Sequence, residues 1–437
     1  MRRVFAIAAI FSCWGLAAQP CAPSEGREQP RCEVIAYPTA EAATAADGGN
    51  NRYFTRITQW ARQSDTLSTP FTVPFVWANR QVLFHVGSAS VPYEVLVNGR
   101  RVARNADGNT PAEFNLTRYV REGRNRLDLI LTQPSDAAPL ESWKEAGAAP
   151  GVTDTWIMSQ PTMRVRDVLT KCWPSNDGDG TAVAEVGIVV KSSALNPRTS
   201  RIYYDLLTPS GETATTGYKE LTLDMRREDT LRFVTRIPAQ LLWSAELPTL
   251  YTLRLKTQHE GRFGEYLELP LGFRTVATDP QGRMTINGQP VRLHAYEINP
   301  QIVSANLLAR LRELGFNTLK FMPGYISPEL LEMCDIQGVY VVAQAPIDSS
   351  KSGASRRKEG NPSNDPAWQA AYIERTGDSY HTTKRHPSVI AFSLASMSSN
   401  GINLYESYLN LKRYGDSRPI IYPDAAGEWN DDPLLLD

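Results

Sequence analysis

The hydrophobic pattern of this chain changes once, near residue 278, and no other feature constrains its fold as strongly. Before that point, short runs such as "QVLFHVGS" alternate apolar and polar residues, which is typical of strands with one buried face. After it, strands that are apolar throughout, such as "VYVVAQA", alternate with stretches of helical spacing. Buried strands that alternate with helices predict a parallel sheet. A chain of 437 residues is long enough for several domains.

The alternating region divides into two predicted sandwiches. Residues 51–150 contain strands joined by tight turns, among them Asn98-Gly99, and predict a β-sandwich of the jelly-roll type. Residues 151–277 contain further strands spaced by turns, and their number and length favour an immunoglobulin-like β-sandwich. Residues 278–437 contain about five strand–helix units, in which Ser327-Pro328 marks a helix start. The chain is therefore predicted to be multidomain.

The N-terminus has the layout of a secretory signal peptide over residues 1–18. Two arginines precede a short apolar run, and small residues follow it at Ala17 and Ala18. This pattern predicts cleavage there and a secreted or periplasmic location. The run is too short to span a bilayer comfortably, so no membrane span is predicted, and a lipid anchor at Cys21 is the lesser alternative. Residues 19–50, rich in Ala, Gly, Pro and acidic residues, predict a poorly ordered linker.

Charge and cysteine spacing argue against two classes of partner. The chain has 46 basic and 47 acidic residues, a balance that does not favour nucleic acid. After cleavage four cysteines remain, and neither their spacing nor the five histidines match a metal-site motif. We therefore predict no metal and no cofactor. Cys21 and Cys32 are close enough in sequence to form a disulfide, and the sequence leaves that pairing open.

Several phrases, taken in order, resemble glycoside hydrolase family 2, the group of β-galactosidases, β-glucuronidases and β-mannosidases. "YEVLVNGRRVARN" resembles the hairpin of its sugar-binding domain, and "LLWSAELPTLYTLRL" followed by "LGFRTV" resembles the end of its middle domain. "INGQPVRLHA" and "RHPSVIAFSL" resemble parts of its barrel. The resemblance covers nearly all of residues 51–437. It implies a jelly roll, an immunoglobulin-like domain and an incomplete TIM barrel, because 278–437 supplies 160 residues against ~250 for a full barrel.

The resemblance also implies which positions would carry the chemistry. Retaining glycosidases use two carboxylates about 5 Å apart. The acid/base Glu of the family corresponds here to Met397, preceded by Ser396, and a thioether neither donates nor accepts a proton. The second catalytic Glu belongs to a barrel strand beyond the fifth, so we expect no nucleophile in these 437 residues. No convincing catalytic residue is therefore predicted.

Other positions near predicted strand ends also depart from the family pattern. Where the family usually has His, Arg and Glu, this chain has Glu297, Lys320 and Gln344. Such ends line the sugar pocket at the mouth of a TIM barrel. The candidate sugar-binding residues are Glu297, Lys320, Tyr325, Gln344, Ser396, Tyr422 and Asp424. For the acidic residues, helix caps or solvated loops are an alternative explanation, and for the tyrosines, packing at the sheet edge.

Three functions remain open at this point. The first is a catalytically inactive family homologue that binds a β-glycoside-like carbohydrate or acts as a structural partner. The second is a weak or split β-galactosidase-like enzyme completed by another chain. The third is a fragment of a decayed glycosidase gene. Because an open five-stranded sheet leaves unpaired edges, we expect another chain, the sandwich domains or an altered closure to cover them.

Overall fold

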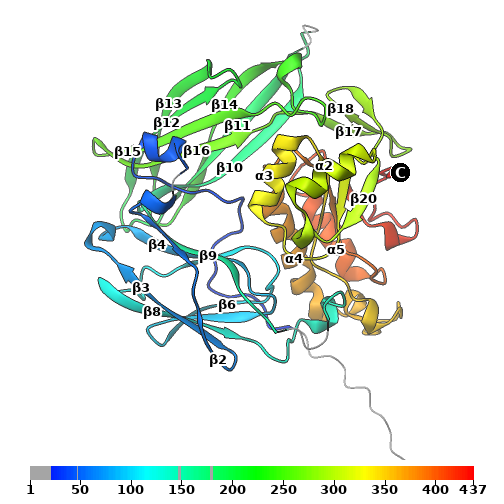
Figure 1. The fold of residues 1–437 in the computed structure, drawn as a ribbon, viewed down its shortest axis with the longest axis horizontal. Helices are drawn as coiled ribbons and strands as arrows, with labels where there is room; N and C mark the ends of the chain where they lie inside the picture. The colour runs from blue at the N-terminus through cyan, green and yellow to red at the C-terminus, as the bar shows by residue number, and fades with distance from the viewer. Residues whose placement is uncertain (1–20, 47, 146–148, 178–180) are drawn as a thin grey trace, which may run out of the picture.

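The computed structural model describes residues 21–437, apart from 47, 146–148 and 178–180. The predicted signal peptide lies outside the described residues. Two antiparallel sandwiches follow one another along the chain and pack beside a parallel sheet covered by helices (Figure 1). The predicted fold class is confirmed: a jelly roll, an immunoglobulin-like sandwich and a partial barrel of parallel strands.

The first sandwich pairs a sheet in the order β2-β3-β8-β5-β6 with a sheet in the order β1-β9-β4-β7. Buried side chains such as Phe84, Phe114 and Leu127 form the core between them. The last strand, β9, pairs with β1 and β4, so this sandwich extends beyond the predicted boundary at 150. The strands are β1 Phe54–Ile57, β2 Ala61–Gln63, β3 Thr66–Val73, β4 Gln81–Ser88, β5 Tyr93–Val97, β6 Arg100–Asn105, β7 Ala112–Asn115, β8 Gly123–Leu131 and β9 Thr153–Gln160.

The second sandwich pairs the sheet β10-β11-β14 with the sheet β13-β12-β15-β16. Its core consists of aliphatic residues such as Val186, Ile202 and Leu253. A small antiparallel sheet, β17-β18-β19, connects it to the parallel domain. The strands are β10 Met163–Pro174, β11 Thr181–Ser192, β12 Arg198–Leu207, β13 Thr213–Leu223, β14 Glu228–Pro238, β15 Tyr251–His259, β16 Arg262–Leu271, β17 Val276–Thr278, β18 Met284–Ile286 and β19 Gln289–Val291.

The parallel sheet runs in sequence order, β20-β21-β22-β23-β24, as predicted for consecutive strand–helix units. Its outer face packs through residues such as Phe321 and Phe392 against Leu308 and Tyr372 of the helices. None of the helices in the described ranges is long and apolar enough to cross a membrane. The strands are β20 Ala295–Ile298, β21 Thr318–Phe321, β22 Tyr340–Gln344, β23 Val389–Ser393 and β24 Ile420–Ile421, and the helices are α1 Ala40–Thr44, α2 Ala305–Glu313, α3 Pro328–Gln337, α4 Gln369–Thr383 and α5 Ile402–Lys412.

Local sequence signals set the ends of helix α3. The Ser327 side chain accepts a hydrogen bond from the Leu330 amide, and Pro328 occupies the first turn, where its missing N–H costs nothing. The helix ends at Gly338, whose φ of 67° is left-handed. A Cβ at this position would lie 2.1 Å from the Ala245 carbonyl oxygen. The glycine is therefore required both for the turn and for contact with the second sandwich.

Residues 431–437 contact both edges of the parallel sheet. At β24, the Asp432 amide donates to the Ile420 carbonyl at 2.9 Å, and the Ile420 amide donates to the Asp432 carboxylate at 2.7 Å. At β20, the Ala295 amide donates to the Asp437 carbonyl at 2.8 Å. Leu434 and Leu436 pack against Val342, Ala391 and Ile421 on the inner face of the sheet. The chain itself thus covers part of the edge that we expected to require protection.

The segment expected to be a poorly ordered linker is instead packed, and we refer to residues 21–37 as the N-terminal segment. Figure 1 shows it in dark blue between the sandwiches and the parallel domain. Arg27 pairs with Asp378 of α4, and Tyr37 forms a β-bridge with Tyr266. Cys32 is fully buried. Its contacts are contributed by distant parts of the chain, which composition alone cannot reveal.

The described cysteines are free, including Cys21 and Cys32. The Cys21 thiol faces the Ala106 carbonyl at 3.6 Å, whereas the Cys32 thiol faces the His381 carbonyl at 3.4 Å. Burial raises the pKa of both thiols, so both remain protonated and weakly reactive. The disulfide that the sequence left open is not formed.

Candidate functional site at the strand ends

Because the five strands are parallel, their carboxyl ends meet at one edge of the sheet, which we call the mouth. Most of the predicted site residues come from this edge. Glu297 lies near the end of β20 and Gln344 at the end of β22. Ser396 and Asp424 lie just beyond β23 and β24. These four residues therefore lie at or near the mouth, and their contacts decide what each side chain can do.

Glu297 and Lys320 contact each other. They occupy paired positions on β20 and β21, and the Lys320 ammonium lies 3.4 Å from the Glu297 carboxylate. The Glu297 side chain is 51% exposed, so water screens the pair and its contribution to stability is small. The two groups could meet a polar ligand, but in the described structure each serves as the counter-charge of the other.

Gln344 and Tyr422 are buried beneath the mouth. The Gln344 amide donates to the Ala345 carbonyl at 2.9 Å. The Tyr422 hydroxyl donates to the Ser398 carbonyl, and burial raises the pKa of this phenol. Both side chains thus form hydrogen bonds to the backbone of neighbouring loops. Both residues lie near the strand ends, and their polar atoms support the loops there.

Tyr325 points away from the mouth. Its hydroxyl donates to Asp154 of the first sandwich at 3.2 Å, and the side chain is buried. Gly87 allows this approach, because a Cβ there would lie 2.5 Å from the Tyr325 hydroxyl oxygen. Tyr325 therefore links the parallel domain to the sandwich, and the structure does not place it with the other candidates.

Met397, which the sequence resemblance compared with the family's acid/base residue, lies on the surface. Its side chain is 68% exposed, and its φ of 46° is in the left-handed region. The Met397 amide donates to the Asp424 carboxylate at 2.8 Å, so these two residues are brought together. Ser396 is held by its amide, which donates to the Ile347 carbonyl at 2.9 Å. Asp424 therefore supports the turn that carries Met397.

The mouth also contains an aromatic side chain that our sequence analysis did not select. Trp429 follows β24, is 56% exposed, and stacks on Tyr405 of α5 with ring centroids 5.0 Å apart. The neighbouring Glu428 pairs with Arg356, from the loop that follows β22, at 3.3 Å. An exposed tryptophan beside charged groups is a surface on which an apolar sugar face can stack.

A cleft lies at the opposite end of the sheet. It has a volume of about 510 Å³ and is lined by β10, α4 and the residues that precede β23 and β24, including Trp173, Arg274 and Arg418. Burial and the neighbouring Arg418 lower the pKa of Arg274 to about 9. Burial and Lys384 lower the pKa of His381 to about 3. This cleft borders the amino ends of the strands, whereas barrel enzymes place their chemistry at the carboxyl ends.

Three family models match consecutive parts of the chain. A model described as the sugar binding domain of glycosyl hydrolases family 2 matches residues 59–168. A second model, described as glycosyl hydrolases family 2, matches residues 164–274, and the TIM barrel domain of the same family matches residues 302–434. The three matches occur in chain order and together span most of the chain. The chain belongs to glycoside hydrolase family 2.

Individual family members show the same relationship. A β-galactosidase from Pectobacterium atrosepticum is 29% identical over 344 residues, which are 74% of this chain and 32% of that protein. A β-galactosidase from Psychromonas ingrahamii is 25% identical over 382 residues, which are 82% and 35% of the two chains. The chain thus spans about a third of the length of these curated relatives.

Solved structures of family 2 share the fold. A β-glucuronidase from Bacteroides uniformis matches with a TM-score of 0.67 and 16% identity, over 82% of this chain and 46% of that one. A putative β-galactosidase from Bacteroides fragilis matches with a TM-score of 0.67 and 14% identity, over 85% and 57% of the two chains. At these identities the likeness establishes the three-domain architecture of the family.

Proposed function

We propose that this chain is a non-catalytic member of glycoside hydrolase family 2 that binds carbohydrate weakly at the mouth. The observation that carries the proposal is Met397. It occupies the position that resembles the family's acid/base residue, and its side chain is 68% exposed with no group capable of proton transfer. General acid catalysis alone contributes about 10²–10⁴-fold, so hydrolysis at this mouth is not expected.

The remaining carboxylates at the mouth are poor substitutes. The Glu297 carboxylate lies 3.4 Å from the Lys320 ammonium, so it already has a partner. Asp424 accepts a hydrogen bond from the Met397 amide and supports the turn that carries Met397. Double displacement needs one nucleophilic and one protonated carboxyl group on either side of the glycosidic bond. Two carboxyl groups that are already engaged in this way support binding of hydroxyls rather than cleavage.

Binding requires less than catalysis, and the mouth retains what binding needs. Trp429 offers an exposed ring, and Lys320, Glu297 and Asp424 offer polar groups around the same edge. An open, hydrated site makes weak use of polar contacts. We therefore expect a dissociation constant of about 1 mM, equivalent to roughly −4 kcal/mol.

Two measurements test the proposal together. Purified chain is assayed for hydrolysis of aryl β-galactosides, β-glucuronides and β-mannosides, and titrated calorimetrically with the corresponding sugars. We expect no turnover, weak binding of at least one sugar, and its loss in Trp429→Ala. Trp173→Ala is the matched control, since Trp173 is similarly exposed at 41% but lies in the distant cleft. Met397→Glu is expected to remain inactive.

The outcomes separate three functions. A turnover number in the usual enzyme range of about 1–10³ per second would overturn the non-catalytic assignment. Turnover that appears only with a second purified chain would favour a split enzyme. If a well-folded sample binds no sugar at several millimolar, the structural-partner function is the better explanation.

The location of the chain is part of the same proposal. We propose that it is exported, on the strength of the lead sequence "MRRVFAIAAIFSCWGLAAQP". Amino-terminal sequencing of the protein from its native source is expected to begin after Ala17 or Ala18. A mature protein that starts at Met1 would contradict export by this route.

A further inference from the structure

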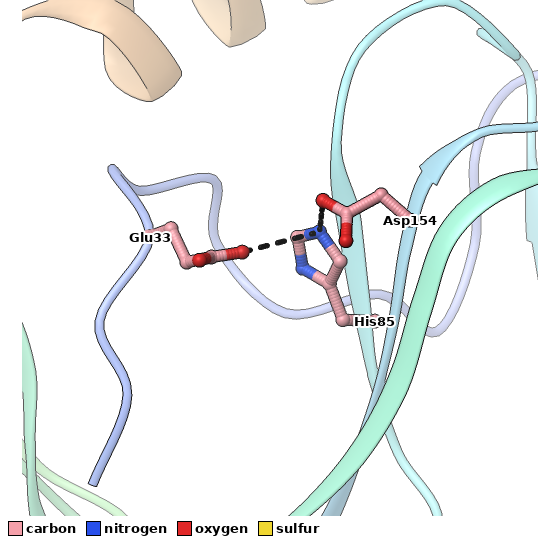
Figure 2. Close-up of side chains that lie close together, drawn as sticks. All are labelled: Glu33, His85 and Asp154. Carbon is pink, nitrogen blue, oxygen red and sulfur yellow. Dashed lines mark ion pairs between the residues drawn. The ribbon is translucent and has the colours of Figure 1, made fainter. Parts of the chain in front are cut away.

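Three ligand-type side chains meet where the N-terminal segment crosses the first sandwich: Glu33, His85 and Asp154, which we call the junction cluster (Figure 2). Glu33 belongs to the N-terminal segment, His85 to β4 and Asp154 to β9. His85 Nε2 lies 3.9 Å from Glu33 Oε2 and 3.9 Å from Asp154 Oδ2. One potential ligand atom from each residue lies within 4.8 Å of the others.

His85 is buried without a hydrogen-bond partner. Its side chain is 4% exposed, and neither ring nitrogen makes a hydrogen bond in the described structure. Most buried polar atoms in proteins do have a partner. The Trp156 ring stacks on the imidazole at 4.3 Å with an interplanar angle of 2°, which fixes its orientation. As Figure 2 shows, Nε2 is thereby aimed between two carboxylates.

The other ring nitrogen faces a third carboxylate. His85 Nδ1 lies 3.7 Å from Glu113 Oε1, and Arg31 holds Glu113 through a contact of 2.7 Å. The Glu113 carboxylate, paired with Arg31, faces Nδ1 and favours the tautomer of His85 with the proton on Nδ1. Nε2 then presents its lone pair, in the carboxylate–histidine arrangement typical of metal ligands.

The two carboxylates are also oriented by neighbouring donors. The Trp156 indole N–H donates to Glu33 Oε2 at 3.3 Å, and the Tyr325 hydroxyl donates to Asp154 Oδ2 at 3.2 Å. Arg56 contacts the other oxygen of Asp154 at 2.9 Å.

Charge and space at the junction cluster suit a dication. The surrounding carboxylates are Glu33, Glu113, Asp154 and the nearby Glu329, and the guanidiniums are Arg31 and Arg56. Carboxylates therefore outnumber guanidiniums among these neighbours. A cavity of about 20 Å³, lined in part by Glu33, His85 and Glu113, has room for roughly one water molecule.

We propose that the junction cluster binds a divalent transition-metal ion of the zinc class, with Glu33, His85 and Asp154 as ligands and a water as the fourth. Imidazole nitrogen combined with carboxylate oxygen favours Zn²⁺ over Mg²⁺ or Ca²⁺. Bonds of ~2.0–2.1 Å set tetrahedral ligand atoms about 3.3 Å apart, so the 3.9 Å separations need only a small contraction. The ion would fasten the N-terminal segment to the first sandwich.

The first experiment measures binding of zinc itself. Purified chain is stripped with chelator, dialysed, and titrated with ZnCl₂ by calorimetry, with bound metal counted by elemental analysis. We expect one tight equivalent per chain, and at least tenfold weaker binding in His85→Gln and Glu33→Gln. Glu329→Gln and His259→Gln are the matched controls, since each removes the same type of group without touching the proposed ligands, and both are expected to bind within threefold of the original chain.

A second experiment does not depend on any variant being folded. Crystals of the unaltered chain are soaked in ZnCl₂, and anomalous scattering at the zinc edge locates the ion. A peak about 2 Å from His85 Nε2, flanked by Glu33 and Asp154, supports the site. The proposal is overturned if folded chain takes up no stoichiometric zinc, if the anomalous peak lies elsewhere, or if His85→Gln binds as tightly as the original chain.

Discussion

The mouth and the junction cluster hold similar chemical groups in opposite states. At the mouth, Glu297 and Lys320 reach solvent and already neutralise each other, and Asp424 is bonded to the Met397 amide. At the junction cluster, His85 is enclosed by protein and its ring nitrogens lack hydrogen-bond partners. Exposure alone therefore does not identify a side chain that is available to bind a ligand. A polar group is available to a ligand when burial removes water from it and the protein supplies no other hydrogen-bond partner.

Ion pairs in the two regions should also differ in how much they contribute to the free energy of unfolding. Exposed ion pairs contribute about 0–1 kcal/mol, whereas removing one partner of a buried pair costs about 3–5 kcal/mol. Breaking a buried ion pair at the junction should therefore change the free energy of unfolding far more than breaking an exposed pair at the mouth.

Arg31→Ala is expected to lower the free energy of unfolding by about 3–5 kcal/mol, because it leaves the carboxylate of Glu113 buried without its counter-charge. The Arg31 side chain is only 3% exposed and contacts Glu113 at 2.7 Å. Urea denaturation in chelator-treated buffer measures the loss. Arg254→Ala is the control, since Arg254 pairs with Glu268 at 2.9 Å but is 45% exposed. Equal losses in both variants would remove the contrast between buried and exposed pairs.

Glu33→Gln is expected to stabilise the metal-free chain by about 1 kcal/mol at pH 8, since it removes a buried charge that lacks full compensation. The pKa of Glu33 is raised by burial, so its contribution to stability is present at low pH and is lost as pH rises through the folded-state pKa. The advantage of the variant should therefore shrink as pH falls toward 4.

Thermal melts across this pH range, with and without ZnCl₂, check the prediction. With zinc the order is expected to reverse, because only the original chain keeps the carboxylate ligand. If Glu33→Gln is the less stable chain at pH 8 without metal, the carboxylate is already well compensated and the case for a cation is weakened.

Met397→Gly is expected to stabilise the chain by about 0.5–1 kcal/mol, because glycine adopts the left-handed backbone without the steric cost that a side chain imposes. Met397 has a φ of 46° and an exposed side chain, so few contacts are lost. Met322→Gly is the matched control: Met322 is also exposed, but it is not among the described residues of positive φ. Chemical denaturation should show a gain for the first variant and a loss for the second.

Lys320→Ala is expected to change the free energy of unfolding by no more than about 0.5 kcal/mol, since its partner Glu297 is half exposed. Raising the salt concentration should change the stabilities of variant and original chain alike. A loss above about 1.5 kcal/mol, beyond the usual range for exposed pairs, would show that the mouth is more tightly organised than its exposure indicates.

Much of the architecture could be predicted because its signals are local. The Asn98-Gly99 pair predicts a tight hairpin turn, and both residues have positive φ, at 51° and 77°, between β5 and β6. The apolar strands from 295 onward predict a parallel sheet, and five parallel strands form it in chain order. Hydrophobic period and turn chemistry depend on neighbouring residues, so one sequence suffices to read them.

The site could be predicted only in outline, because its contacts are not local. Tyr325 lies near a strand end, as expected, but no local pattern indicates that its hydroxyl donates a hydrogen bond to Asp154. The junction cluster combines the N-terminal segment with β4 and β9, so no short motif reports it. The same holds for Arg31 and Cys32, whose burial depends on residues far along the chain.

The path of the N-terminal segment has a consequence for the order in which the molecule can assemble. Ser24 and Arg27 contact Glu374 and Asp378, some 350 residues later. In a chain made from its amino end, these contacts can form only after α4 has been made, whereas contacts of the segment with the first sandwich, such as the β-bridge of Arg27 with Phe114, can form earlier. Complete docking of the segment therefore waits for the parallel domain, and contacts of such large sequence separation slow folding. The N-terminal segment is thus among the last parts of the described structure to make all of its contacts.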